Sequence, residues 1–101
     1  MRCIMTLDEI IQDIHALEEH LLAYERKFGV LSETFYQSYT QGEEPPNAAW
    51  VLDWSDWAAS YHIWLQRKEK YQNMVQSLQN DLPLPELIRR MASREPVSII
   101  P

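Results

Sequence analysis

The sequence contains few residues that could hold a metal ion. His15 and Glu19 are four positions apart, so on a helix they would share one face. No Glu-x-x-His pair, His-Glu-x-x-His motif or pair of cysteines accompanies them, and those are the patterns that di-iron bundles and zinc sites use. We therefore predict no metal site and interpret His15 and Glu19 as a solvated helix face.

Candidate nucleophiles are equally isolated. Cys3 lies near the start of the chain with no fixed histidine partner, and the serines lie outside any glycine-rich elbow. Two glycines cannot build a phosphate-binding loop. His62 lies one position away from a run of aromatic residues, where a histidine is more often a packing residue than a base. We predict no catalytic residue, no cofactor and no enzymatic activity.

The segment WVLDWSDWAASYHIW, residues 50–64, holds all four tryptophans of the chain. At about 100° per residue, its large aromatics would fall on one helical stripe within an arc of about 80°. The stripe could be a ligand platform, a nucleic-acid stacking surface or a core. A stacking groove would interleave Arg or Lys, which this segment lacks. Each aromatic buries a large area, so we favour a core, with a small-molecule site as the weaker alternative.

The charge distribution excludes several partners. The 101-residue chain, which is the length of one domain, carries a net charge of −6. Residues 1–66 hold eleven acids and three bases, and residues 67–101 hold four acids and six bases. Nucleic-acid binding needs cations and a basic recognition helix, so we expect no direct nucleic-acid binding. Without a secretory segment, a membrane-length apolar run or a cysteine pair, we expect a cytoplasmic protein with no membrane contact.

The first helix is expected over residues 7–28. The segment TLDE at 6–9 is a capping box, and apolar residues then recur at spacings of three and four. Gly29 follows as the residue that ends the helix. A shorter helix is expected between Ser32 as its N-cap and Gly42 as its stop.

A long helix should follow the proline pair at 45–46. Either Asn47 or Asp53 could cap its start, and it should end near Asn80. Prolines then interrupt the tail, and Pro85 suits the first turn of a short helix. The fold class is therefore all-α: an antiparallel helical hairpin with a short connecting helix, a long C-terminal helix and a proline-broken tail. The expected core consists of Ile10, Ile14, Leu17, Leu21, Tyr24, Phe28, Phe35, Trp50, Trp54, Trp57, Tyr61 and Trp64.

The two long helices differ in predicted length. At about 1.5 Å per residue, a helix over 7–28 spans about 33 Å and one over 48–80 about 50 Å. The last third of the long helix would remain uncovered, and contiguous apolar surface usually marks an interface. We therefore divide the chain into a helical body, residues 1–81, and a partner-binding tail, residues 82–101. The expected partner-binding residues are Tyr71, Met74, Val75, Leu78, Leu84, Leu87, Ile88, Arg89, Arg90 and Met91.

Residues 17–64 carry several short motifs. Leu-x-x-Tyr-Glu-x-x-Phe-Gly occupies positions 21–29, Ser-x-x-Phe-Tyr positions 32–36, Gly-Glu positions 42–43 and Trp-Ala positions 57–58. In these motifs the chain resembles a family of small antitoxins encoded beside short toxins of the TumE type. The resemblance implies an antitoxin that binds and neutralises a cognate toxin, expected to be a ribonuclease. A tail that lies over the toxin's active site would be the simplest mechanism of inhibition.

Two functions from different classes therefore remain. The first is a protein-binding antitoxin, for which an acidic body without catalytic groups suits a basic nuclease partner. Deleting residues 82–101 is then expected to leave a folded body that no longer captures its partner. The alternative is a homo-oligomeric structural bundle, such as a homodimer, in which the surplus of the long helix pairs with its own copy.

Overall fold

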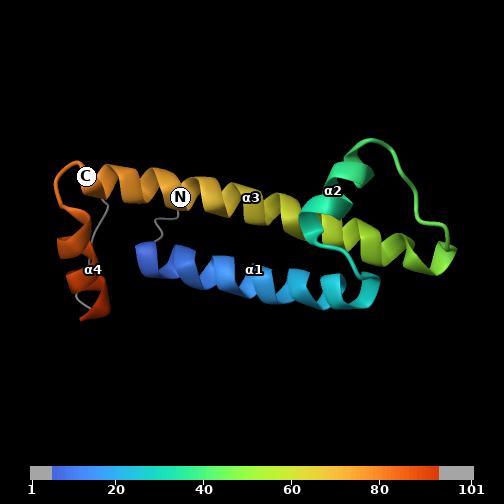
Figure 1. Cartoon of the computed structure of the whole chain (residues 1–101), viewed down its shortest axis with the longest axis horizontal. Coiled ribbons are helices and arrows are strands. Elements are labelled where there is room, and N and C mark those ends of the chain that lie inside the picture. The colour runs from blue at the N-terminus through green and yellow to red at the C-terminus, as the bar shows by residue number, and fades with distance from the viewer. Residues whose placement is uncertain (1–5, 94–101) are drawn as a thin grey trace, which may run out of the picture. The chain divides into compact units, whose positions relative to one another are not determined.

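The computed structural model describes residues 6–93. In this range the elements are α1 (Leu7–Phe28), α2 (Ser32–Thr40), a 3-10 turn η1 (Ala48–Trp50), α3 (Val51–Gln79) and α4 (Leu84–Ala92) (Figure 1). No strand occurs between residues 6 and 93, and the prediction of an all-α fold is confirmed. Cys3 and the last eight residues of the expected tail lie outside the described residues.

Helix α1 has the predicted boundaries, which its termini explain. The backbone N–H of Thr6 donates to Glu9 Oε1 at 2.8 Å, and the N–H of Glu9 donates to Thr6 Oγ1 at 3.1 Å. This is the reciprocal capping box that the sequence predicts. At the other end Gly29 has φ +80°, a left-handed conformation that a residue without Cβ adopts readily.

The start of α2 differs from the prediction. Leu31, not Ser32, occupies the N-cap position and makes no side-chain cap bond. Ser32 is the first helical residue, and Glu25 of α1 caps it instead: its Oε2 accepts the Ser32 backbone N–H at 2.9 Å and the Ser32 hydroxyl at 2.7 Å. A carboxylate from a neighbouring helix therefore satisfies a free N–H at the start of α2. Gly42, with φ +97°, follows its end as predicted.

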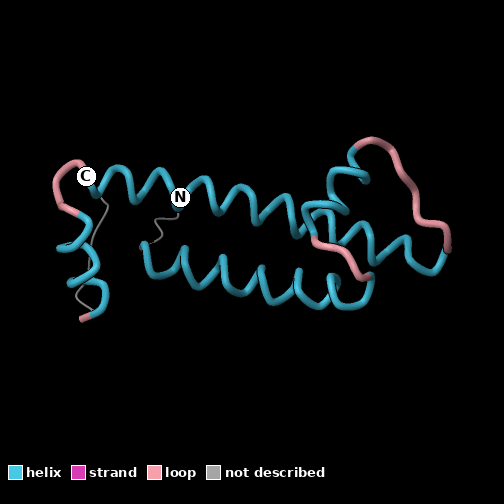
Figure 2. Tube along the Cα trace, viewed as in Figure 1, coloured by secondary structure: helices cyan, strands magenta, loops and turns pink. Residues whose placement is uncertain are grey.

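The start of the long helix is resolved in favour of Asn47. Its Oδ1 accepts the backbone N–H of Ala49 at 2.8 Å and so caps η1, which leads directly into α3. Asp53 lies inside the first turn of α3, where an acid favours the helix dipole. The segment that contains the two prolines is the loop between α2 and η1 (Figure 2).

The chain folds into two units, to both of which α1 and α3 contribute. The central unit is His15–Gln66, and the terminal unit is built from residues up to Ile14 and from Arg67 onward. In the central unit α1 and α3 lie side by side and run in opposite directions (Figure 1), since Tyr24 bonds to Asp56 while Glu18 bonds to Trp64, nearer the end of α3.

Trp57 organises the core of the central unit. It is fully buried, and the Phe35 ring of α2 stacks on it in parallel, with ring centroids 3.8 Å apart. The rings of Tyr24 and Phe28 of α1 also stack against it, at 5.7 and 5.4 Å. Its indole Nε1–H donates to Ser32 Oγ at 2.8 Å. The residues of this core and those packed against it are Leu21, Phe35, Trp57, Ala58, Tyr24, Phe28, Tyr36, Tyr39, Trp54, Tyr61 and Trp64.

The terminal unit has its own apolar core, which corrects two of the predicted partner contacts. Met74 and Leu87 were expected on a partner surface, but both are buried, as are Leu7, Ile10 and Ile14 of α1. The reason is that α4 does not continue α3. The Leu82 N–H donates back to Leu78 O at 2.9 Å, and Pro83 and Pro85 then begin a separate helix.

The unit boundaries also differ from the predicted division after residue 81, because α4 belongs to the same unit as the start of α1. Removing residues 82–101 would therefore delete Leu87 from a core instead of trimming a free tail. The remaining expected partner residues lie at or near the surface: Leu84, Ile88 and Arg89 are exposed, and Tyr71, Val75, Leu78, Arg90 and Met91 are partly buried.

Candidate functional site

His15 and His62, the two histidines considered as a metal ligand and as a base, both lie exposed on helices. His15 and Glu19 are both exposed, and residues 6–93 contain no group of three side chains suited to holding a metal ion. The ring of His62 lies 3.3 Å from the Tyr36 hydroxyl and 3.3 Å from the Gln66 amide. These contacts tie His62 to its own helix and to α2.

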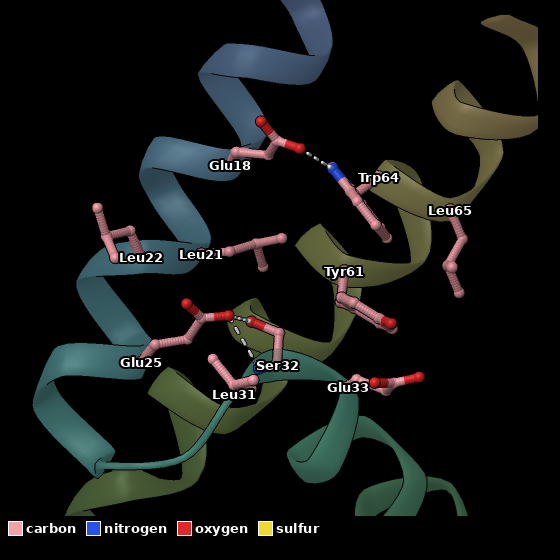
Figure 3. A pocket seen from close by; sticks show the side chains of 10 residues that line it. All are labelled: Glu18, Leu21, Leu22, Glu25, Leu31, Ser32, Glu33, Tyr61, Trp64 and Leu65. Atoms are coloured by element: carbon pink, nitrogen blue, oxygen red, sulfur yellow. Dashed lines mark hydrogen bonds between the residues drawn. The ribbon is translucent and has the colours of Figure 1, made fainter.

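The central unit carries an open groove on its surface. It has a volume of about 630 Å³. Figure 3 shows α1 on one side, α3 on the other, and the first residues of α2 across one end. The lining residues are Glu18, Leu21, Leu22, Glu25, Leu31, Ser32, Glu33, Tyr61, Trp64 and Leu65.

Helical spacing explains why these residues face one another. Residues three and four apart on a helix are neighbours on its surface, and the α1 wall consists of Glu18, Leu21, Leu22 and Glu25. On α3 the same spacing brings together the residues Tyr61, Trp64 and Leu65. The groove therefore lies beside the core-facing residues of α1 and α3. There one additional leucine on each helix, Leu22 on α1 and Leu65 on α3, reaches the surface.

The groove is apolar and accessible. Leu21 is buried and forms part of its floor, whereas Leu22, Leu31 and Leu65 are 41%, 65% and 40% exposed. The rings of Tyr61 and Trp64 stack at 5.4 Å and make one rigid wall. Three large leucine side chains thus border one depression while remaining open to solvent, and exposed apolar surface of this kind is typical of interaction sites.

Three carboxylates line this apolar surface, and no lysine or arginine is among its lining residues. Glu18 Oε2 accepts the indole N–H of Trp64 at 3.1 Å, and Glu25 Oε2 accepts from Ser32. These bonds fix two of the carboxylates in place. Within residues 6–93, Glu33 makes no hydrogen bond or ion pair.

Burial and the negative charge of the groove both act on the pKa of Tyr61. Burial raises the pKa of the Tyr61 hydroxyl, and the charges near it, Glu33 and Glu25 among them, raise it further. Both causes disfavour a phenolate beside the carboxylates. Burial, the larger cause, disfavours any charge at this position, whereas the effect of Glu33 and Glu25 is specific to added negative charge.

A second polar cluster joins α1 to α3 outside the groove. Asp56 Oδ2 accepts the Tyr24 hydroxyl at 2.6 Å and lies 2.7 Å from His20 Nε2. These hydrogen bonds lower the pKa of Asp56 below its ordinary value. The hydrogen bond to Asp56, together with burial and the charges of Asp56 and Asp53, raises the pKa of Tyr24 to about 12.

The pKa of Tyr24 gives a pH prediction. The neutral hydroxyl is favoured in the folded state, so its stabilising effect is complete below pH 10.0 and is lost between 10.0 and about 12. Phenolate absorbance should show a component that titrates at about 12 and disappears in Tyr24→Phe. Asp56→Asn should move this component toward 10.0; an unchanged titration in Asp56→Asn would contradict the assignment.

No protein-family model matches the chain, and no curated protein or solved structure is significantly similar to it. None of the helices within residues 6–93 is both long and apolar enough to cross a bilayer.

Of the predicted core residues, Leu21, Phe35 and Trp57 are buried in the central unit, whereas Leu17 and Trp50 are only partly buried, and the sequence does not predict the groove. Of the groove residues, Leu21, Tyr61 and Trp64 were predicted as core, while Leu22 and Leu65 were not singled out. Both directly follow a stripe residue, so each widens the apolar face of its helix. A wider apolar face on each of the two helices is the feature of the sequence that could have indicated the groove. Only the fold shows that these two faces meet beside the start of α2.

Proposed function

We propose that this protein is an antitoxin that acts in the cytoplasm, binds a cognate toxin directly and neutralises it. The observation that carries the proposal is the groove of exposed leucines lined by three glutamates. Burying apolar surface contributes about 25 cal/mol per Å². A partner that covers these leucines would therefore bind more tightly, because apolar surface that is exposed in the free protein would be removed from water.

Charge supports a nuclease as the target. A ribonuclease must carry lysines and arginines that hold RNA phosphates. An acidic protein is attracted to that basic surface, and complementary charge raises the association rate and the specificity of binding. Two of the three groove glutamates, Glu25 and Glu18, are held by Ser32 and Trp64, so they present negative charge without the cost of ordering free side chains.

The C-terminal helix offers a smaller second surface for the same partner. Leu84 and Ile88 are four residues apart on α4, and both are exposed. Arg89 and Arg90 pair with Glu86 on the same helix, and these arginines hold the pKa of Glu86 at about 2. The positive charge of α4 is thus partly neutralised within the helix, which makes the acidic groove the stronger contact for a basic toxin.

The proposal is tested by co-expression. The protein encoded beside this chain should arrest growth when it is produced alone, and this chain should restore growth and co-purify with it. Growth arrest that this chain does not relieve would contradict the proposal. A neighbouring product that is harmless when expressed alone would contradict it equally.

The alternative function, a homo-oligomeric bundle, is favoured by the exposure of Leu84 and Ile88 on one side of α4. Light scattering on the purified chain distinguishes the two candidates. The antitoxin needs no self-association, so a mass of 12.0 kDa agrees with it. A stable dimer that dissociates in Leu84→Glu with Ile88→Glu would favour the bundle instead.

A further inference from the structure

The walls of the groove restrict what can bind there. Both long walls are helices, α1 and α3, whose interior backbone N–H and C=O groups are already paired within the helix. An extended peptide that binds by adding a strand needs a free sheet edge. No strand occurs in residues 6–93, so an occupant must dock through its side chains.

The openness of the groove argues against a small molecule. A volume of about 630 Å³ would hold one, but small-molecule sites bury most of the surface of their ligand. Here Leu22, Leu31 and Leu65 remain 40% or more exposed, so a small ligand would leave much apolar surface wet. A segment that extends along the groove would cover all three.

From these observations we infer that the groove binds an amphipathic helix of the partner, whose leucine-like stripe is flanked by lysine or arginine. The inference rests on the proposed function, because the toxin is the partner that would supply this helix. A helix presents apolar anchors three and four positions apart. Leu22, Leu31 and Leu65 with the ring of Trp64 form the apolar surface that would receive these anchors.

The carboxylates supply the charge complement. The hydrogen bonds of Glu18 and Glu25 within residues 6–93 use Oε2, so Oε1 of each can accept from an incoming cation. In Figure 3, Glu18 lies at one end of the groove and Glu33 at the other. Basic residues near both ends of the apolar stripe of the incoming helix would therefore meet acids at both ends of the groove.

The inference is tested with model peptides on the intact chain. A helix-forming peptide of about 20 residues carries leucines at helical spacing, flanked by lysine and arginine. A second peptide replaces the basic residues with glutamate, and a third is basic but proline-rich. Binding is followed at the indole N–H resonance of Trp64, assigned by its disappearance in Trp64→Phe, because this group bonds to Glu18 inside the groove.

The basic helical peptide is expected to shift the Trp64 resonance saturably and to bind at least about tenfold more tightly than the other two peptides, a difference of about 1.4 kcal/mol. Equal binding of the acidic peptide would overturn the charge assignment. Tighter binding of the proline-rich peptide than of the basic helical peptide would overturn the inference that the occupant is a helix. No shift up to about 1 mM basic helix, which corresponds to a free energy of only about −4 kcal/mol, would overturn the inference entirely.

Matched variants separate this inference from the proposed function. Glu18→Gln with Glu33→Gln should weaken the basic helix at least about tenfold, whereas Glu43→Gln with Glu44→Gln removes the same charge from an exposed loop outside the groove and should not. If the groove variant still neutralises the toxin fully, the inference fails and the function stands. If the peptide binds at the groove but no toxin is neutralised, the function fails and the inference stands.

Discussion

Replacing Trp57 with alanine is expected to lower the free energy of unfolding by about 3–5 kcal/mol. Trp57 is fully buried, stacks on Phe35 and donates to Ser32. The substitution leaves a cavity between three helices and removes the donor that satisfies the Ser32 hydroxyl. Since small domains have about 5–15 kcal/mol in total, the variant should lose a large fraction of its stability. Urea denaturation followed by circular dichroism measures this loss.

Conservative variants separate packing from hydrogen bonding. Trp57→Phe loses the bond to Ser32, whereas the buried indole nitrogen of Trp54 has no hydrogen-bond partner within the described residues, so Trp54→Phe loses none. We expect Trp57→Phe to be the more destabilising of the two. A loss below about 1 kcal/mol in Trp57→Ala, far under the range for buried tryptophan, would contradict the central place of this residue in the core.

Replacing Leu22 and Leu65 together with glutamate is expected to weaken toxin binding at least about 100-fold. Leu22 and Leu65 are 41% and 40% exposed, so covering each contributes only part of the ~1.5–3 kcal/mol of a fully buried leucine. Most of the loss comes from the two added charges, which would be buried beside the existing glutamates. Both leucines are partly exposed in the free protein, so the fold should tolerate the change. Calorimetry with the toxin that co-expression identifies measures the affinity, and thermal melting checks the fold.

Leu52 provides the matched control for this pair. It is 82% exposed and lies on α3 outside the groove. Leu52→Glu adds the same kind of charge to the same unit and should leave toxin affinity within about threefold, less than 1 kcal/mol. Equal losses in the groove variant and in Leu52→Glu would show that general acidity, not the groove, determines binding.

The sequence predicts the helices well where their signals are local. The capping box at Thr6 and Glu9 and the left-handed Gly29 define α1 without tertiary information. The aromatic spacing likewise places Trp57 on the apolar face of α3. By contrast, Ser32 has the residue type of an N-cap, but a carboxylate from α1 takes that role. This bond to a residue of another helix overrides the preference of serine for the N-cap position. The residues next to Ser32 in the sequence give no indication of it.

The terminal unit and the groove depend on distant segments, which is why the sequence does not reveal them. In the sequence, Met74 and Leu87 resemble residues of an uncovered interface. In the structure both are buried, because the turn at Leu82 and Pro83 places α4 in the same unit as the end of α3. The groove needs α1, α3 and the start of α2 together. Apolar residues at helical spacing identify a face that must be covered, but not whether the cover belongs to the same chain.

The central claim is that a toxin docks in this groove. The most direct measurement is a methyl spectrum of the chain, labelled at leucine, isoleucine and valine, during titration with the toxin. A toxin that docks in the groove should cause large shifts at Leu22, Leu31 and Leu65 and none at Leu52. Shifts confined to Leu84 and Ile88, with the groove methyl groups unchanged, would contradict it and place the partner on α4.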